Sequence, residues 1–258
     1  MDGCGVDLYG VFDGHGPYGD TVAAWLAANL PFAVQSALNG YEANALIAVE
    51  QAFVQIDSDC KNILGAKTLE ISGATATVVL HKDGEILVAG LGDSRAILGG
   101  PEKFSNIQVL TAPHNPADPI ERARIQKRGG EVGVFPGEPP VSTTGQGRVF
   151  VAGTDYPGLA TARTFGDATA KTVGVIAEPS IKTAKTLGRK QVLLIATDGV
   201  WDVVSDAYAV EMALCFAGPL DAARAAEALV QEARAIWETR EGSEVMIDDI
   251  SALVVYLP

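Results

Sequence analysis

The chain has 258 residues, 48% of them apolar, with 28 glycines and 13 prolines, and this composition excludes a disordered chain and fits a loop-rich globular protein. Its net charge of −13 argues against nucleic acid or an anionic membrane as the main partner and leaves many carboxylates available for cations. The three cysteines show no Cys-x-x-Cys spacing, so neither a zinc knuckle nor a disulfide framework is predicted. With no signal peptide and no long uncharged apolar run, we expect an intracellular location, in the cytoplasm or nucleus.

The first strong signal is a short run of strand formers at 8–12 that ends in an Asp-Gly turn. An aspartate at the end of a strand, here Asp13, can direct its carboxylate into a cleft. Gly14 has no side chain, so its carbonyl oxygen can approach an ion, and His15 can exchange a proton near neutral pH. These residues fit a metal site ligated by oxygen with an acid/base group beside it. Taken alone, they would fit an ordinary turn equally well.

Hydrophobic spacing predicts the remaining elements in chain order. Amphipathic helices are expected at 20–38, where Pro31 should kink or break the helix, and at about 42–61. The period then changes to that of strands, which we expect at 72–81, 85–90 and 95–98, joined by short turns as an antiparallel meander. Beyond them we expect a helix at 120–128, surface loops over 132–158, a strand at 192–197, helices at 205–216 and 221–240, and a final strand at 250–257.

Four aspartates stand where predicted strands end or begin, and two more lie close to them in sequence: Asp13, Asp93, Asp198 and Asp248, with Asp202 and Asp249 nearby. Each of them singly is a common turn residue. Because they are spread over the whole chain, only the rim of a folded sandwich or barrel could bring them together. Oxygen ligands without a cluster of histidines or cysteines indicate Mg²⁺ or Mn²⁺ rather than Zn²⁺.

Seven blocks carry a resemblance when they are taken in order: 11–16 (VFDGHG), 72–76 (SGATA), 91–95 (LGDSR), 110–132 (LT, His114, Glu121, RI and GGEV), 163–167 (Arg163 with GD), 196–202 (ATDGVWD) and 248–251 (DDIS). Together they resemble the motif set of the metal-dependent, protein phosphatase 2C-type (PPM) Ser/Thr phosphatases. The resemblance implies an α+β fold in which two stacked antiparallel sheets are flanked by helix pairs, with metal ions at one end of the sandwich.

The resemblance also implies roles for individual residues. The ligands of two Mg²⁺ or Mn²⁺ ions, and of a third and weaker ion site, would be Asp13, Gly14, Asp198, Asp248, Asp93 and Asp202. Asp13 would bridge the two main ions and His15 would be the general acid. Asp249 stands where the family often has Asn, so the choice between Asp248 and its neighbour stays open. Outside this set, we expect His114 to be structural and Arg163 to form a buried salt bridge, while Asp167 could be a ligand or a brace of the fold.

The implied function is hydrolysis of phosphoserine and phosphothreonine in protein substrates by a hydroxide that bridges the metals, without a phosphoenzyme. The protein would be a monomer whose partners are phosphorylated proteins, with neither nucleic acid nor membrane among them. We expect one domain over 1–258 that lacks the first N-terminal strand of the family. Because that strand carries an acidic pair and a phosphate-binding arginine in the family, an inactive scaffold (a pseudophosphatase) is one alternative. A metal-dependent hydrolase of small phosphoesters is another.

Overall fold

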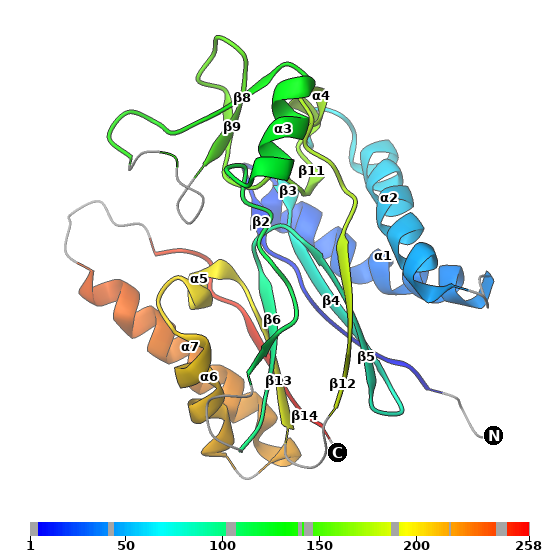
Figure 1. Ribbon diagram of the computed structural model, residues 1–258, viewed down its shortest axis with the longest axis vertical. Helices are drawn as coiled ribbons and strands as arrows, with labels where there is room; N and C mark the ends of the chain where they lie inside the picture. Colours follow the sequence, from blue (N-terminus) through cyan, green and yellow to red (C-terminus); the bar gives the residue numbers. More distant parts are fainter. Residues whose placement is uncertain are drawn as a thin grey trace.

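Two four-stranded antiparallel sheets are stacked face to face, and a pair of helices covers the outer face of each (Figure 1). The computed structural model describes residues 5–40, 44–101, 107–138, 141, 147–186, 191–216, 218–240 and 247–257. Apolar residues fill three layers: one between the sheets and one beneath each helix pair. This arrangement confirms the predicted α+β sandwich with flanking helix pairs.

The first sheet has the order β1-β4-β5-β12, from strands Asp7–Val11, Ala76–Lys82, Glu85–Leu91 and Ser180–Lys185. The second has the order β14-β13-β6-β7, from strands Ala252–Leu257, Gln191–Ala196, Arg95–Gly99 and Gln108–Val109. The predicted meander is therefore wrong at its third strand. After β5 the chain crosses to the other sheet, where β6 pairs with β13.

The helices α1 (Gly19–Gly40) and α2 (Ala45–Leu64) pack together on the first sheet. The break expected at Pro31 does not occur, because Leu30 and Val34 on either side of it are fully buried and hold the helix in place. By length and mean hydropathy (1.2), residues 19–39 could also cross a membrane. A face of α1 nevertheless packs into the core, as in a helix of a globular protein.

On the second sheet, α6 (Asp206–Leu214) and α7 (Ala222–Thr239) form the other helix pair. The smaller elements gather near one end of the sandwich (Figure 1). They are β2 (Gly14–His15), β3 (Gly73–Ala74), α3 (Pro119–Lys127), β8 (Gly130–Gly133), β9 (Arg148–Val151), β10 (Pro157–Leu159), β11 (Phe165–Gly166), α4 (Ala168–Thr172) and α5 (Asp198–Trp201), with the short 3-10 helix η2 (Pro219–Asp221) elsewhere. The loops predicted over 132–158 are partly right, although residues 139–140 and 142–146 lie outside the described residues.

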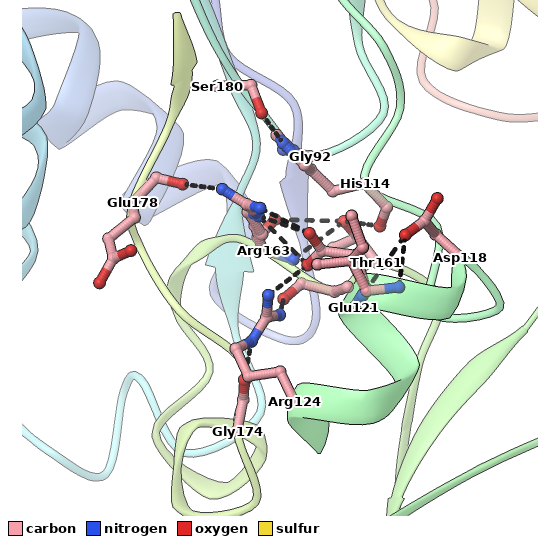
Figure 2. A network of polar contacts seen from close by, with 12 residues as sticks. Gly92, His114, Asp118, Glu121, Arg124, Thr161, Arg163, Gly174, Glu178 and Ser180 are labelled. Atoms are coloured by element: carbon pink, nitrogen blue, oxygen red, sulfur yellow. Dashed lines mark hydrogen bonds and ion pairs between the residues drawn. The ribbon is translucent and has the colours of Figure 1, made fainter. Parts of the chain in front are cut away.

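A buried ion-pair network joins α3 to the segment that precedes β12 (Figure 2). Glu121 is only 4% exposed, and its carboxylate accepts from Arg124 Nη1 and Arg163 Nη2, each at 2.5 Å. The two arginines also donate to backbone carbonyls, among them those of Gly174 at 2.7 Å and Glu178 at 3.0 Å. The salt bridge expected for Arg163 is confirmed. Burial alone raises the pKa of Glu121, but the two guanidinium groups bring it below its ordinary value.

We expect Glu121→Gln to lower the free energy of unfolding by about 3–5 kcal/mol, because two partly buried guanidinium groups lose their anion. The matched control is Glu85→Gln, which removes the carboxylate of an exposed pair with Lys185 and should cost no more than about 1 kcal/mol. Denaturant unfolding of both variants measures the difference. Equal losses would show that the network does not hold this part of the fold.

The segment that crosses from β5 to β6 is held in place by hydrogen bonds to a buried histidine. Gly92 has φ +102°, which favours glycine, and its N–H donates to His114 Nδ1 at 3.0 Å. His114 Nε2 lies 2.7 Å from Ser180 Oγ, so the ring joins the crossing to β12. His114 is buried, and this burial, followed by the charge of Arg163, lowers its pKa to about 4. The structural role expected for His114 is therefore confirmed.

Because His114 binds a proton less readily when folded than when unfolded, its neutral ring supports the fold fully above about pH 6.5. This support is lost as the pH falls toward the folded-state pKa of about 4. From pH 7 to pH 4 we expect the wild type to lose about 3 kcal/mol more stability than His114→Gln, which cannot titrate. Urea unfolding of both proteins at matched pH tests this, and parallel pH profiles would refute it.

Candidate active site

The register of the strands gathers the predicted aspartates at one end of the sandwich. In the first sheet, the ends of β1 and β5 both pair with the beginning of β4. In the second, the end of β13 pairs with the beginnings of β6 and β14. The segments after β1, β5 and β13, and the one before β14, therefore leave the sheets at the same end. This end lies near β2 and α5 in Figure 1.

A pocket of about 380 Å³ opens at this end. Six of the seven predicted site residues line it, namely Asp13, Gly14, His15, Asp93, Asp198 and Asp248. Asp202, the seventh, lines an adjoining pocket of about 270 Å³ whose wall also includes Asp93 and Asp198. A larger groove of about 640 Å³ beside β5 and β12 is lined mainly by aliphatic side chains, and none of the predicted site residues lies in it.

The aspartates raise one another's pKa. Burial and the nearby charges of Asp248 and Asp93 raise the pKa of Asp13 to about 7, although a hydrogen bond with Asp198 opposes the shift. Burial, followed by the charges of Asp93, Asp248 and Asp13, raises the pKa of Asp198 to about 9. Such shifts mean that several negative charges have been brought together out of water. A bound cation would remove that repulsion, and perturbed carboxylates in a cleft are typical of functional sites.

The donor set fits a hard divalent cation. Within the described residues, no three side chains of His, Cys, Asp or Glu converge closely enough to enclose one ion by themselves. Mg²⁺ usually takes only one or two carboxylates from a protein and keeps several waters, and oxygen ligands also suit Mn²⁺. Carboxylates spread around a pocket therefore fit hydrated Mg²⁺ or Mn²⁺ better than a closed protein cage.

The structure bears on two questions about the predicted ligands: whether Asp248 or Asp249 faces the pocket, and why residue 14 is a glycine. Asp248 is among the residues that line the pocket and Asp249 is not, while the backbone carbonyl of Asp249 accepts a hydrogen bond from Thr197 Oγ1 at 2.9 Å. This difference favours Asp248 over Asp249 as the ligand. Gly14 has a packing requirement as well, because a Cβ atom there would lie 2.1 Å from the carbonyl oxygen of Gly19.

Two further residues line the pocket: Asp167, which the sequence left open as a ligand or a brace of the fold, and Arg148, which was not predicted. Asp167 accepts a hydrogen bond from His15, with 2.6 Å between Nε2 and Oδ2. Arg148 lines both pockets, where Glu138 binds its guanidinium group at 2.8 Å and its Nη1 donates to the carbonyl of Gly158. The sequence signal for Asp167 was its block with Gly166. Arg148 stands among loop residues, with no motif around it.

His15 therefore has a defined polar environment. Its side chain is 30% exposed. Burial alone lowers the pKa of His15, but the charge and hydrogen bond of Asp167, followed by the charges of Asp93 and Asp13, raise it above its ordinary value. The arrangement combines clustered carboxylates with an imidazole at the edge of the same pocket. It is suited to metal-assisted hydrolysis with a proton donor.

Comparison with known proteins supports the same interpretation. The family model for protein phosphatase 2C matches residues 5–240. A rice protein named probable protein phosphatase 2C 64 is 36% identical, with 97% of this chain and 58% of that protein covered. An Arabidopsis protein named probable protein phosphatase 2C 61 is 34% identical, with 97% of this chain and 75% of that protein covered. The chain thus spans between about half and three quarters of these two relatives.

Solved structures support the fold. A serine-threonine phosphatase 2C from Toxoplasma gondii superposes with a TM-score of 0.72 at 24% identity, over 96% of this chain and 84% of that one. A sex-determining protein of C. elegans gives a TM-score of 0.77 at 21% identity, over 97% of this chain and 56% of that one. At these identities the likeness shows the fold alone. Taken with the family model and the two plant relatives, the comparisons show that the chain belongs to the protein phosphatase 2C family.

Proposed function

We propose that the chain is a metal-dependent protein phosphatase that hydrolyses phosphoserine and phosphothreonine in protein substrates. One observation carries the proposal most strongly: Asp13, Asp198 and Asp248, from distant parts of the chain, line one pocket together with His15. Such a pocket, in a member of this family, suits two Mg²⁺ or Mn²⁺ ions held mainly by these carboxylates. Asp93 and Asp202, which face the adjoining pocket, would serve a third ion.

Hydrolysis of a phosphate monoester requires charge stabilisation at the phosphoryl group and a proton for the leaving oxygen. Hydrolysis of phosphate monoesters is among the slowest uncatalysed reactions. When bound, the ions would lower the pKa of water and neutralise charge on the phosphoryl group. The leaving serine or threonine oxygen is a poor leaving group, so a proton has to reach it as the P–O bond breaks. His15 is the group in the pocket that would donate this proton, and no covalent phosphoenzyme is required.

The alternatives are distinguished by separate observations. The scaffold alternative finds no support in the comparisons, since the curated relatives are named as probable phosphatases. Hydrolysis of small phosphoesters would use the same carboxylates. The rates on a phosphothreonine peptide and on a sugar phosphate therefore separate that alternative from protein phosphatase activity.

We expect Mn²⁺ or Mg²⁺ to stimulate release of phosphate from a phosphothreonine peptide, and EDTA to abolish it. Asp198→Asn should lower the rate by about 100-fold or more, because the pocket loses a central anionic ligand. Phosphate release, measured with and without metal, checks both outcomes. No release at saturating Mn²⁺ would overturn the proposed function, and a clear preference for the sugar phosphate would reassign its substrate.

The same substitution should stabilise the metal-free protein. Burial and the neighbouring aspartates raise the pKa of Asp198 to about 9, so its carboxyl has to take up a proton when the chain folds at neutral pH, whereas an amide does not. We expect Asp198→Asn to raise the free energy of unfolding in EDTA by about 1–2 kcal/mol and to reduce the rise in Tm that Mn²⁺ produces in the wild type. Asp155→Asn, at an exposed position outside the pocket, is the matched control and should change neither quantity. A destabilised, fully metal-responsive Asp198→Asn protein would contradict this account of the site.

A further inference from the structure

We propose that Asp167 is a positioning residue that holds the His15 ring by its Nε2–H, so that Nδ1 is the nitrogen that serves the leaving oxygen. The inference rests on the proposed function for its chemistry and on the fold for its geometry. The carboxylate Oδ2 of Asp167 lies 2.6 Å from His15 Nε2. Nδ1 makes no hydrogen bond to any residue in the part of the chain that the structure describes.

The backbone is built around this pair of side chains. The strands β2, β3 and β11 form a small sheet in which Gly73 lies between His15 on one side and Gly166 on the other. A Cβ atom on Gly73 would lie 2.1 Å from Asp167 Oδ2 and 2.8 Å from His15 Nε2. Only a glycine leaves room for the carboxylate and the imidazole to meet over this strand. The small sheet therefore explains why the SGATA block contains glycine.

Asp167 itself is held firmly. It is 2% exposed, and its backbone adopts the left-handed conformation with φ +49°, which aspartate and asparagine tolerate better than most residues. Its N–H donates to the carbonyl of Ser72 at 2.9 Å, next to Gly73. A strained and buried aspartate whose carboxylate contacts a pocket histidine indicates a functional constraint as well as a turn.

A separate set of contacts, made by Asp57, holds the residues on either side of Asp167. Asp57 on α2 accepts from the N–H of Gly166 at 2.9 Å and also binds Lys171 Nζ on α4. These contacts fix the two sides of Asp167 to the helix layer without touching His15. Asp57 therefore offers a way to loosen the same turn while the contact between Asp167 and His15 is kept.

The chemical consequence concerns the path of one proton. As the P–O bond breaks, the proton on Nδ1 passes to the serine or threonine oxygen, while water adds to phosphorus as hydroxide and releases its second proton to solvent. The imidazole keeps its Nε2–H, which continues to donate a hydrogen bond to the Asp167 carboxylate. The ring then regains a proton on Nδ1 from solvent. Catalytic groups oriented by a third residue in this way lose much of their effect when the orienting residue is changed.

The test compares two substrates in the presence of Mn²⁺. Hydrolysis of a phosphothreonine peptide needs a proton on the leaving oxygen, whereas p-nitrophenolate leaves as a stable anion. We expect Asp167→Asn, which suits the same backbone conformation, to lower kcat for the peptide by about 10- to 100-fold and kcat for p-nitrophenyl phosphate by less than about 3-fold. Asp57→Asn is the control and should lower Tm without changing the ratio of the two rates.

The outcomes separate this inference from the proposed function. If the wild type hydrolyses neither substrate, the proposed function fails. If the wild type is active and Asp167→Asn lowers both rates by the same factor, so that their ratio stays unchanged as expected for Asp57→Asn, Asp167 only braces the fold and the inference is overturned.

A readout that requires neither metal nor turnover is the nuclear magnetic resonance signal of His15. The chain has three histidines, so the ring signals can be assigned by substitution. We expect a low-field Nε2–H proton signal from His15 in the metal-free wild type and in Asp57→Asn, and its loss or upfield shift in Asp167→Asn. An unchanged signal in Asp167→Asn would contradict the proposed hydrogen bond.

Discussion

The mutual repulsion of carboxylates at one end of the sandwich is the constraint on which the site depends. The strand register forces Asp13, Asp93 and Asp198 toward one another, and burial raises the pKa of each. Folding brings these charges together at a cost that only protonation or a cation can offset. The electrostatics of the fold therefore favour binding of the cations that its proposed chemistry uses.

The rest of the molecule holds this unfavourable cluster in place. Three apolar layers fix the two sheets and their helix pairs. The crossing at Gly92, held by His114, places Asp93 in the wall of the pocket. On the other side, the glycine at position 73 allows Asp167 and His15 to meet. Rigid surroundings of this kind keep acid, base and ligand groups in their positions without help from the substrate.

Much of this could be predicted from local patterns. The apolar strands that end in Asp-Gly located Asp13 and Asp198, and helical spacing located both helix pairs. Three features could not be predicted, for physical reasons. The edge strand β12 is mostly polar and exposed, so it lacks a strong apolar alternation. The move of β6 to the second sheet depends on pairing with β13, far along the chain. The contact between His15 and Asp167 joins residues 152 positions apart through a sheet of two-residue strands, which leave no periodic signal.

The most direct test of the central claim is the anomalous scattering of a crystal soaked in Mn²⁺. The account predicts two strong peaks about 3.5–4 Å apart in the pocket, with Asp13 between them and Asp198 and Asp248 in contact. Well-ordered crystals that show no peak among these carboxylates, or a peak elsewhere only, would contradict it.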